Sequence, residues 1–203
     1  MSTQRGRFIV FEGGEGCGKS TQSRRLADRL GAVWTREPGG SELGVRLREL
    51  LLSKETGELD PRAEALLMAA DRAQHVAELI GPALESGATV VCDRYVGSSV
   101  AYQGFGRGLD PLGVANLTGW ATDDLWPDLV VLLTVPSAVS ASRLGSELDR
   151  FESAGSEFHE RVVAGFAEQA ASDPGRWVVI DGNAPVEVVG SAVDAAVADR
   201  LGL

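Results

Sequence analysis

The chain is short of cysteine and of long apolar runs, and both shortages exclude classes of protein. Its 203 residues include two cysteines, Cys17 and Cys92. That is too few for the disulfide framework of a small secreted protein, so a reducing cytoplasm is the expected location. No stretch reaches the roughly 18 apolar residues that a membrane helix needs. The polar segment Met1–Arg7 leads directly into an apolar run, so neither a signal peptide nor a membrane partner is expected.

Positive charge is also scarce, and almost all of it comes from arginine. The chain has 29 acidic and 19 basic residues, a net charge of −10, and its two lysines are Lys19 and Lys54. An acidic surface repels a nucleic-acid backbone, so nucleic acid is not expected as a partner. Arginine binds phosphate through a planar, bidentate fork. The composition therefore favours a small phosphorylated ligand held by a few arginines.

What the chain does have is a glycine-rich turn, Gly13 to Ser20, with the spacing G-x-x-x-x-G-K-S. It follows the apolar run Phe8–Phe11 and precedes a helical pattern, as a phosphate-binding loop does. Glycines let backbone N–H groups turn toward an anion, and the helix that follows points its positive end at it. In this pattern Lys19 binds the β- and γ-phosphates and Ser20 provides a hydroxyl ligand to Mg²⁺. The predicted nucleoside triphosphate site comprises Gly13, Gly14, Glu15, Gly16, Cys17, Gly18, Lys19, Ser20 and Thr21.

Five short apolar runs rich in β-branched residues predict parallel strands that are covered on both faces. Helical patterns separate them, which is typical of a layered α/β sheet with helices on both sides. In such sheets ligands bind beyond the carboxyl ends of the strands. The predicted strands are Phe8–Phe11, Ala32–Thr35, Thr89–Cys92, Leu129–Val135 and Trp177–Ile180, and a last helix is expected from Pro185 to about Leu201.

The third predicted strand ends in a charged pair, Asp93 and Arg94. An aspartate there suits the water shell of Mg²⁺ opposite Ser20, and the arginine can hold an acceptor phosphate. The alternative is a structural ion pair that caps the strand.

Two further loops carry weaker signals. Thr35–Gly40 contains a Pro-Gly turn beside Arg36, and such turns are usually structural. The segment Ser98–Gly104 offers hydroxyls and an amide that could bind a base or a sugar, or could equally cap a helix.

A long helix is predicted from Arg62 to about Glu85, with Asp60 as its N-cap and a kink near Gly81-Pro82. Its apolar residues cover more than one face, so it is either a central helix or part of a dimer interface, and we favour the interface. Arg72 lies among these apolar residues and is expected to face a pocket or a carboxylate. His75, one turn later, is expected at the helix surface or at an interface.

Between residues 137 and 160 the apolar pattern lapses, and the segment carries Arg143 and Arg150. A lid with these arginines would close over the triphosphate, exclude water and neutralise charge in the transition state. The alternative is a solvated helical hairpin whose arginines form surface ion pairs.

Taken together, these segments resemble a bacterial thymidylate kinase of the P-loop nucleoside monophosphate kinase family, over essentially the whole length. The resemblance rests on FEGGEGCGKSTQ, TREPGG, ADRAQH, DRYVGSSVAYQGFGRG, DRFE and VVIDG. It implies one P-loop NTPase domain over residues 1–203, with a five-stranded parallel sheet in three α/β layers and a short lid at about 137–160. It also implies transfer of the γ-phosphoryl of ATP to dTMP in dTTP synthesis, with Mg²⁺, by a homodimer.

The resemblance further implies roles for single residues. Glu15 approaches the 3′-hydroxyl of the acceptor, Arg72 hydrogen-bonds thymine, and Tyr102 packs under the deoxyribose. The implied catalytic residues are Lys19, Asp93, Arg94, Arg143 and Arg150, and the implied Mg²⁺ ligands are Ser20 and Asp93. The implied acceptor-binding residues are Glu15, Arg36, Arg48, Met68, Arg72, Arg94, Ser99, Tyr102 and Gln103.

Three departures from the family pattern stand out. Gly16 replaces an arginine that some members have in the phosphate loop, so the lid must supply that charge. Yet Gly145 and Ser146 occupy a stretch where relatives often carry a further arginine. Met68 replaces a phenylalanine that usually stacks on thymine, and methionine packs less specifically. Phe166 replaces a common tyrosine, which removes a hydroxyl near the site.

The expected chemistry is direct, in-line phosphoryl transfer, because the acceptor phosphate is already a competent nucleophile. The nearest alternative is a kinase for a different nucleoside monophosphate or for a deoxynucleoside. A nucleoside acceptor would need a carboxylate base near its 5′-hydroxyl, whereas arginine is predicted there. A second alternative, a nucleotide-binding regulator with little or no hydrolysis, is supported only by the arginine-poor lid.

Overall fold

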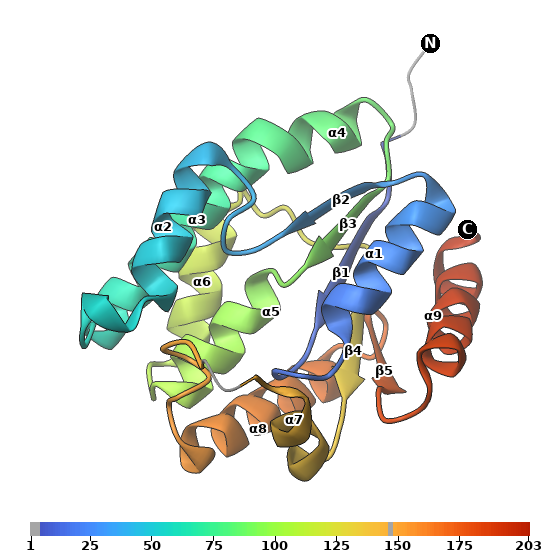
Figure 1. Cartoon of the computed structure of the whole chain (residues 1–203). Coiled ribbons are helices and arrows are strands. Elements are labelled where there is room, and N and C mark those ends of the chain that lie inside the picture. The colour runs from blue at the N-terminus through green and yellow to red at the C-terminus, as the bar shows by residue number, and fades with distance from the viewer. Residues whose placement is uncertain (1–4, 146–147) are drawn as a thin grey trace.

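A five-stranded, fully parallel sheet forms the centre of the molecule (Figure 1), in strand order β2-β3-β1-β4-β5. The computed structural model describes residues 5–145 and 148–203. Each predicted strand is present within a residue of its expected bounds, because a continuous apolar run can only be satisfied between two covering layers. The strands are β1 (Phe8–Glu12), β2 (Val33–Arg36), β3 (Val90–Asp93), β4 (Leu129–Thr134) and β5 (Trp177–Asp181).

Alternate residues of β1 face two separate apolar cores, since successive side chains of a strand point to opposite faces. Phe8 and Val10 belong to one core and Ile9 and Phe11 to the other. The second core is closed by α1 (Lys19–Leu30) and α9 (Val186–Leu201), which lie on the same side of the sheet (Figure 1). The first core is closed mainly by α4 (Gly81–Glu85), α5 (Val96–Ser99), α6 (Pro111–Ala121) and α8 (Ser156–Ser172). The predicted three-layer α/β fold is confirmed.

The remaining helices surround the carboxyl edge of the sheet. They are α2 (Glu42–Leu52), a short 3₁₀ turn (Lys54–Thr56), α3 (Pro61–His75), the π-helical stretch Val100–Gly106 that continues α5, and α7 (Ser137–Arg143). None of the helices within the described part of the chain is both long and apolar enough to cross a bilayer.

The long predicted helix is present but not uniform. It begins with Asp60 as N-cap, whose carboxylate accepts the N–H of Arg62, then passes through a π-helical stretch, Val76–Ile80, before continuing as α4. Pro82 has no N–H to donate and its ring crowds the preceding turn. The chain accommodates it with one wider turn, in which Gly81 donates to the carbonyl of Val76, as π-bulges do.

Because all five strands are parallel, their carboxyl ends lie at one edge of the sheet, where ligands of such folds bind. Phe11 and Arg36 both pair with Asp93 across the sheet. The phosphate loop, the Asp93–Arg94 pair and the loop after β2 therefore converge at this edge.

Candidate active site

The phosphate loop joins β1 to the first turn of α1 and surrounds a cavity with its backbone. Seven of its nine predicted residues line this cavity, namely Glu15, Gly16, Cys17, Gly18, Lys19, Ser20 and Thr21. Gly13 and Gly14 are not among its lining residues. Ala184, just before α9, and Val186 and Val189, in its first turn, give the cavity an apolar wall.

Two glycines of this loop are required by the space around them. Gly13 has φ +141°, and a Cβ there would lie 2.4 Å from the carbonyl oxygen of Leu133. Gly16 has φ +65°, and a Cβ there would lie 2.8 Å from the carbonyl oxygen of Ser140 in α7. Both positions combine a left-handed backbone with a close backbone neighbour, so any larger residue would push the loop away.

Lys19 is held inside the loop. Its ammonium donates to the carbonyl of Gly14 at 2.9 Å and lies 3.5 Å from a carboxylate oxygen of Glu15, and the residue is only 6% exposed. Lys19 lines the phosphate-loop cavity, and its binding of the β- and γ-phosphates stays a prediction.

Ser20 and Asp93 meet at the start of α1, where the Ser20 hydroxyl donates to Oδ2 of Asp93. The other oxygen of Asp93, Oδ1, is buried and has no hydrogen-bond partner within residues 5–145 and 148–203. A buried carboxylate oxygen without a donor fits a cation or a cation-bound water. The donor set, one hydroxyl and one carboxylate, is the sparse oxygen set that Mg²⁺ accepts when phosphates complete its shell.

Arg143, at the end of α7, lies against the same loop. Its guanidinium donates to the carbonyls of Gly16, at 3.1 Å, and Gly182, at 3.2 Å, and it lines the phosphate-loop cavity. Ser140 of α7 also donates to the carbonyl of Glu15 at 2.8 Å. The first part of the predicted lid is therefore joined to the loop at Gly16, the position that lacks an arginine of its own.

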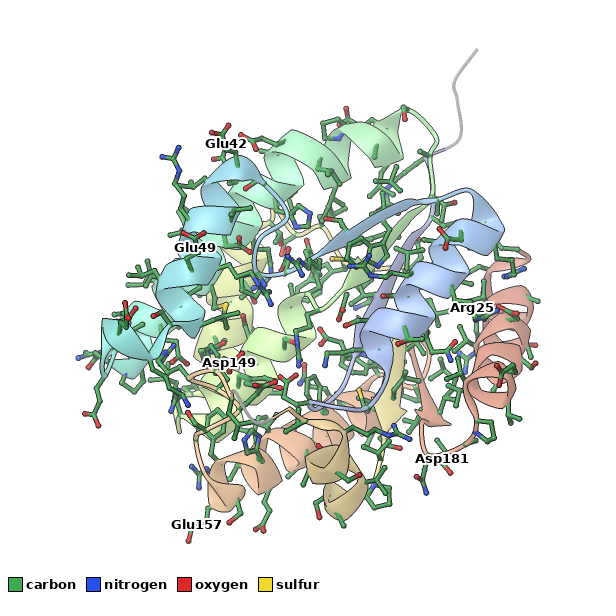
Figure 2. All side chains as sticks on the ribbon, viewed as in Figure 1. Arg25, Glu42, Glu49, Asp149, Glu157 and Asp181 are labelled. Atoms are coloured by element: carbon green, nitrogen blue, oxygen red, sulfur yellow. The ribbon has the colours of Figure 1, made fainter. Side chains whose placement is uncertain are left out.

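A second cavity adjoins the first, and its lining combines three arginines with acidic, polar and apolar residues. Glu15 and Glu152 line both cavities. The second cavity contains most of the predicted acceptor residues, namely Glu15, Arg48, Met68, Arg72, Arg94, Ser99, Tyr102 and Gln103. It also contains Asp149 and Phe151 from the lid segment. In Figure 2 the side chain of Asp149 lies inward, whereas the exposed acids Glu42, Glu49 and Glu157 point away from the centre.

Arg94 lies at the boundary between the two cavities, and its backbone is left-handed, with φ 70°. Its guanidinium donates to Glu15, to the hydroxyl of Tyr102 and to the carbonyl of Gly13. Burial alone would raise the pKa of Glu15, but the charges of Arg94 and Lys19 lower it to about 2. Glu15 is therefore a fixed anion at neutral pH, and it raises the pKa of Arg94 despite the burial of that guanidinium.

The turn that carries Arg94 is held by Glu12, the last residue of β1 and fully buried. One carboxylate oxygen of Glu12 accepts the backbone N–H groups of Tyr95, at 3.0 Å, and Ser98, at 2.9 Å; the other accepts the Ser98 hydroxyl at 2.6 Å. That hydroxyl in turn accepts a hydrogen bond from Arg94 at 3.1 Å. Burial raises the pKa of Glu12 to about 7, against the lowering effect of the Ser98 hydrogen bond.

Arg72 confirms the expectation of a carboxylate partner. It is 1% exposed, and its Nε donates to Glu37 at 2.6 Å while its two terminal nitrogens donate to Ser99 Oγ and to the carbonyl of Tyr95. The prediction for His75 is wrong. His75 is fully buried, with Nδ1 2.9 Å from Glu37 and Nε2 2.7 Å from Thr35 Oγ1, because the loop after β2 folds back over α3.

Arg150 lies on the acceptor side, away from the position that the lid hypothesis gives it over the triphosphate. Its Nη1 donates to Glu64 of α3 at 2.6 Å, and its Nε donates to the carbonyl of Leu51 at 2.8 Å. Phe151 beside it is buried and packs edge-on to Tyr102, with ring centroids 5.7 Å apart. The second part of the predicted lid is thus anchored to the body of the protein, and of its central residues Ser146 and Glu147 lie outside the described part.

Of the other predicted residues, Arg48 and Met68 line the acceptor cavity, whereas Arg36 does not. Arg48 donates to the carbonyl of Pro38 at 2.8 Å, and burial followed by the charge of Arg36 lowers its pKa. Arg36 itself is exposed at the end of β2. Met68 lines the apolar side of the cavity. Phe166 packs edge-on to Tyr102 at 6.2 Å, so the aromatic face there is kept without the hydroxyl.

Sequence reasoning missed three buried glutamates, Glu12, Glu37 and Glu64, each no more than 3% exposed. For Glu12 and Glu37 a signal existed, since both lie at carboxyl ends of strands. For Glu64 no distinguishing signal was present in the sequence, since it lies in the first turn of α3, where an acid is also favoured at a solvent-exposed helix start.

The geometry thus combines an anion-binding loop with an adjoining arginine-lined cavity, the arrangement needed to bring two phosphorylated ligands together. The family model described as thymidylate kinase matches residues 11–193. A thymidylate kinase from Cutibacterium acnes is 47% identical over 201 residues, covering 97% of this chain and 98% of that protein. One from Bifidobacterium longum subsp. infantis is 50% identical, covering 97% and 88%.

The solved structures agree with these sequence relationships. The crystal structure of thymidylate kinase from Ehrlichia chaffeensis superposes with a TM-score of 0.80 at 32% identity, covering 95% of this chain and 99% of that one. The chain therefore belongs to the thymidylate kinase family, the phosphotransferases that make dTDP from dTMP and ATP.

Proposed function

We propose that the two adjoining cavities are the donor and acceptor sites for transfer of the γ-phosphoryl of ATP to dTMP. The observation that carries this proposal is that Glu15 lines both cavities while it pairs with Lys19 on one side and Arg94 on the other. Transfer requires the two phosphates to approach within bonding distance. The two phosphates would then meet beside Glu15 of the phosphate loop, between the side chains of Lys19 and Arg94.

On the donor side the loop residues Gly13 to Thr21 cradle the phosphates of ATP and Lys19 neutralises their charge. Arg143, already against Gly16, supplies the positive charge that the loop itself lacks. Ser20 and Asp93 would hold Mg²⁺, which when bound neutralises the β- and γ-phosphate oxygens. The apolar wall at Val186 and Val189 suits the adenine.

On the acceptor side Arg94 holds the phosphate of dTMP and Arg48 flanks it, with Arg36 adding positive charge at the entrance. Glu15 accepts a hydrogen bond from the 3′-hydroxyl of the deoxyribose. Its low pKa keeps the carboxylate charged, and so an acceptor, at all physiological pH values. Tyr102, fixed against Glu15 and Phe151, packs under the sugar. The base enters among Met68, Arg72, Ser99 and Gln103.

The protein contributes positioning and electrostatics to the transfer step. The acceptor phosphate oxygen attacks the γ-phosphorus directly, so no enzyme nucleophile or strong base is required. Lys19, Arg94 and Arg143 approach the reacting phosphates from different sides and stabilise the charge spread over the transferring group. Residues 137–160, as a lid on the single domain of residues 1–203, would exclude water and so limit hydrolysis.

An acceptor panel tests this function. ADP release from ATP should be measured with dTMP, dUMP, dCMP, dGMP, AMP and thymidine, with and without Mg²⁺. We expect dTMP to be the best acceptor, dUMP second, and thymidine inactive. A preference for another monophosphate or for thymidine would overturn the acceptor assignment, and ATP binding without acceptor-dependent ADP release would favour a regulatory protein.

We further propose a homodimer that forms through α2, α3 and α6, which are side by side in Figure 1. These helices expose large apolar residues, including Leu66 at 57%, Leu112 at 67% and Trp120 at 83%, and clustered exposure of this kind marks an interface. Light scattering should show a dimer that Trp120→Glu dissociates. Val163→Glu, at an exposed apolar position of α8, is the control that should leave it intact.

The need for ATP and the two free, buried cysteines support a cytoplasmic location for this reaction.

A further inference from the structure

Glu64 is a fully buried carboxylate beneath the acceptor cavity. It accepts hydrogen bonds from the side chains of three residues. Gln103 donates through Nε2 at 2.9 Å, Arg107 through Nε and Nη2 at 3.1 Å each, and Arg150 through Nη1 at 2.6 Å. Glu64 does not line the acceptor cavity itself, but its partner Gln103 does.

This contact determines which way the amide of Gln103 points. A carboxylate accepts hydrogen bonds and cannot donate them, so only the NH₂ end of the amide can face Glu64. Arg107 and Arg150 also donate to this carboxylate, so every group that faces it in the described part of the chain is a donor. If the amide rotated by half a turn, its carbonyl oxygen would face a buried carboxylate oxygen, an arrangement with two acceptors and no proton. The carbonyl oxygen of Gln103 and its second N–H are therefore left for the cavity.

The edge of that amide that does not face Glu64 is one acceptor beside one donor. Thymine and uracil present the matching pair, an N3–H donor beside a carbonyl oxygen. Cytosine presents the opposite pair, an N3 acceptor beside an amino donor, which the same amide would match only after rotating. We propose that Glu64 is a specificity-determining positioning residue, which fixes the Gln103 amide in the orientation that accepts thymine and rejects cytosine.

Ser99 supports this direction of readout. Its Oγ accepts from Arg72 at 3.0 Å, so its own proton is free to donate to a carbonyl of the base. Met68, by contrast, can only pack on the ring. Gln103 and Ser99 therefore contribute to hydrogen-bond readout of the base beside Arg72, and Glu64 sets the orientation of Gln103.

The proposal rests on dTMP being the acceptor, and its test uses the ratio of kcat/KM for dTMP to kcat/KM for dCMP. Glu64→Gln keeps the shape but offers Gln103 either a donor or an acceptor. We expect the ratio to fall about 10-fold or more, as expected when one hydrogen-bonding preference is lost. Because both rates are measured on one preparation, a smaller folded fraction cancels from the ratio.

Two further variants separate orientation from stability. Arg107→Ala removes a different partner of Glu64 and should leave the ratio within about twofold, even if the melting temperature falls. Gln103→Leu should itself lower the ratio, and adding Glu64→Gln to it should lower it no further, because the effect passes through Gln103.

An unchanged ratio in Glu64→Gln, or an equal fall in Arg107→Ala, would overturn the role of Glu64. So would a further fall in the double variant. Failure of wild type to use dTMP would instead overturn the proposed function, so the two failures are distinguishable.

Discussion

The donor and acceptor cavities adjoin, yet they are built in different ways. The donor cavity is made by the backbone of the phosphate loop, with left-handed glycines at Gly13, Gly16 and Gly18. The acceptor cavity is made by side chains from several elements, and buried acids support Arg72, the turn of Arg94 and the amide of Gln103. Glu12 holds the turn of Arg94, Glu37 holds Arg72, and Glu64 holds Gln103.

This difference decides how each site responds to substitution. A backbone-built site depends on local conformation, so most of its side chains are dispensable and a few, such as Lys19, are essential. A site built from buried ion pairs is coupled, because removing one partner leaves the other charge buried and unpaired. Donor-side variants should therefore lose turnover, whereas acceptor-side variants should lose affinity, selectivity and stability together.

The largest effect is expected from Lys19→Ala. Loss of the only lysine in the phosphate loop removes charge stabilisation of the transferring group, and kcat should fall by at least about 10³-fold. The KM for dTMP should change little, since Lys19 lies on the donor side. Steady-state kinetics with Lys54→Ala as the control measures this, because Lys54 is the other lysine and is exposed on a short helix. Turnover near that of wild type in Lys19→Ala would disprove the donor assignment.

A comparison of Arg143→Ala with Arg150→Ala tests whether the two lid arginines act on different sites, one on the donor side and one on the acceptor side. Arg143 contacts the phosphate loop, so its loss should lower kcat by about 10²–10³-fold. Arg150 contacts Glu64, so its loss should lower kcat less than about tenfold, raise the KM for dTMP and reduce stability by about 1–3 kcal/mol. Steady-state kinetics and urea unfolding of both variants measure this. A larger fall in kcat for Arg150→Ala than for Arg143→Ala would instead indicate that Arg150 acts on the triphosphate.

The residues that line the donor cavity could be predicted from the sequence, whereas those that line and support the acceptor cavity could be predicted only in part. The strands, the phosphate loop and the convergence at one sheet edge were predicted, because apolar runs and glycine spacing are local signals. Arg72 and Arg94 were also found, but His75 was placed wrongly and Glu64 was missed. Such residues are defined by partners distant in the chain, such as Glu37 for His75 and Arg150 for Glu64, and no local pattern specifies a pairing of that kind.

The smallest expected effect concerns Glu12, and it shows how a buried acid affects the stability of the acceptor side. Burial raises the pKa of Glu12 from 4.5 to about 7. The folded chain therefore holds this proton more tightly than the unfolded chain does, and the contribution of Glu12 to stability falls as the pH rises from about 4.5 to 7. Glu12→Gln cannot titrate. Across that range the unfolding free energy of wild type, relative to that of the variant, should fall by of order 2 kcal/mol.

Urea unfolding from pH 4.5 to 8, followed by tryptophan fluorescence, measures this difference. Because Glu15 has a pKa lowered to about 2 and is present in both proteins, its opposite pH dependence cancels. Ser98→Ala provides the matched comparison, since it removes one donor to Glu12 and should raise the Glu12 pKa further, which would move the fall to higher pH. A difference that stays flat or grows with pH would mean that Glu12 is charged throughout. The stability of the acceptor side would then not depend on protonation of Glu12 between pH 4.5 and 8.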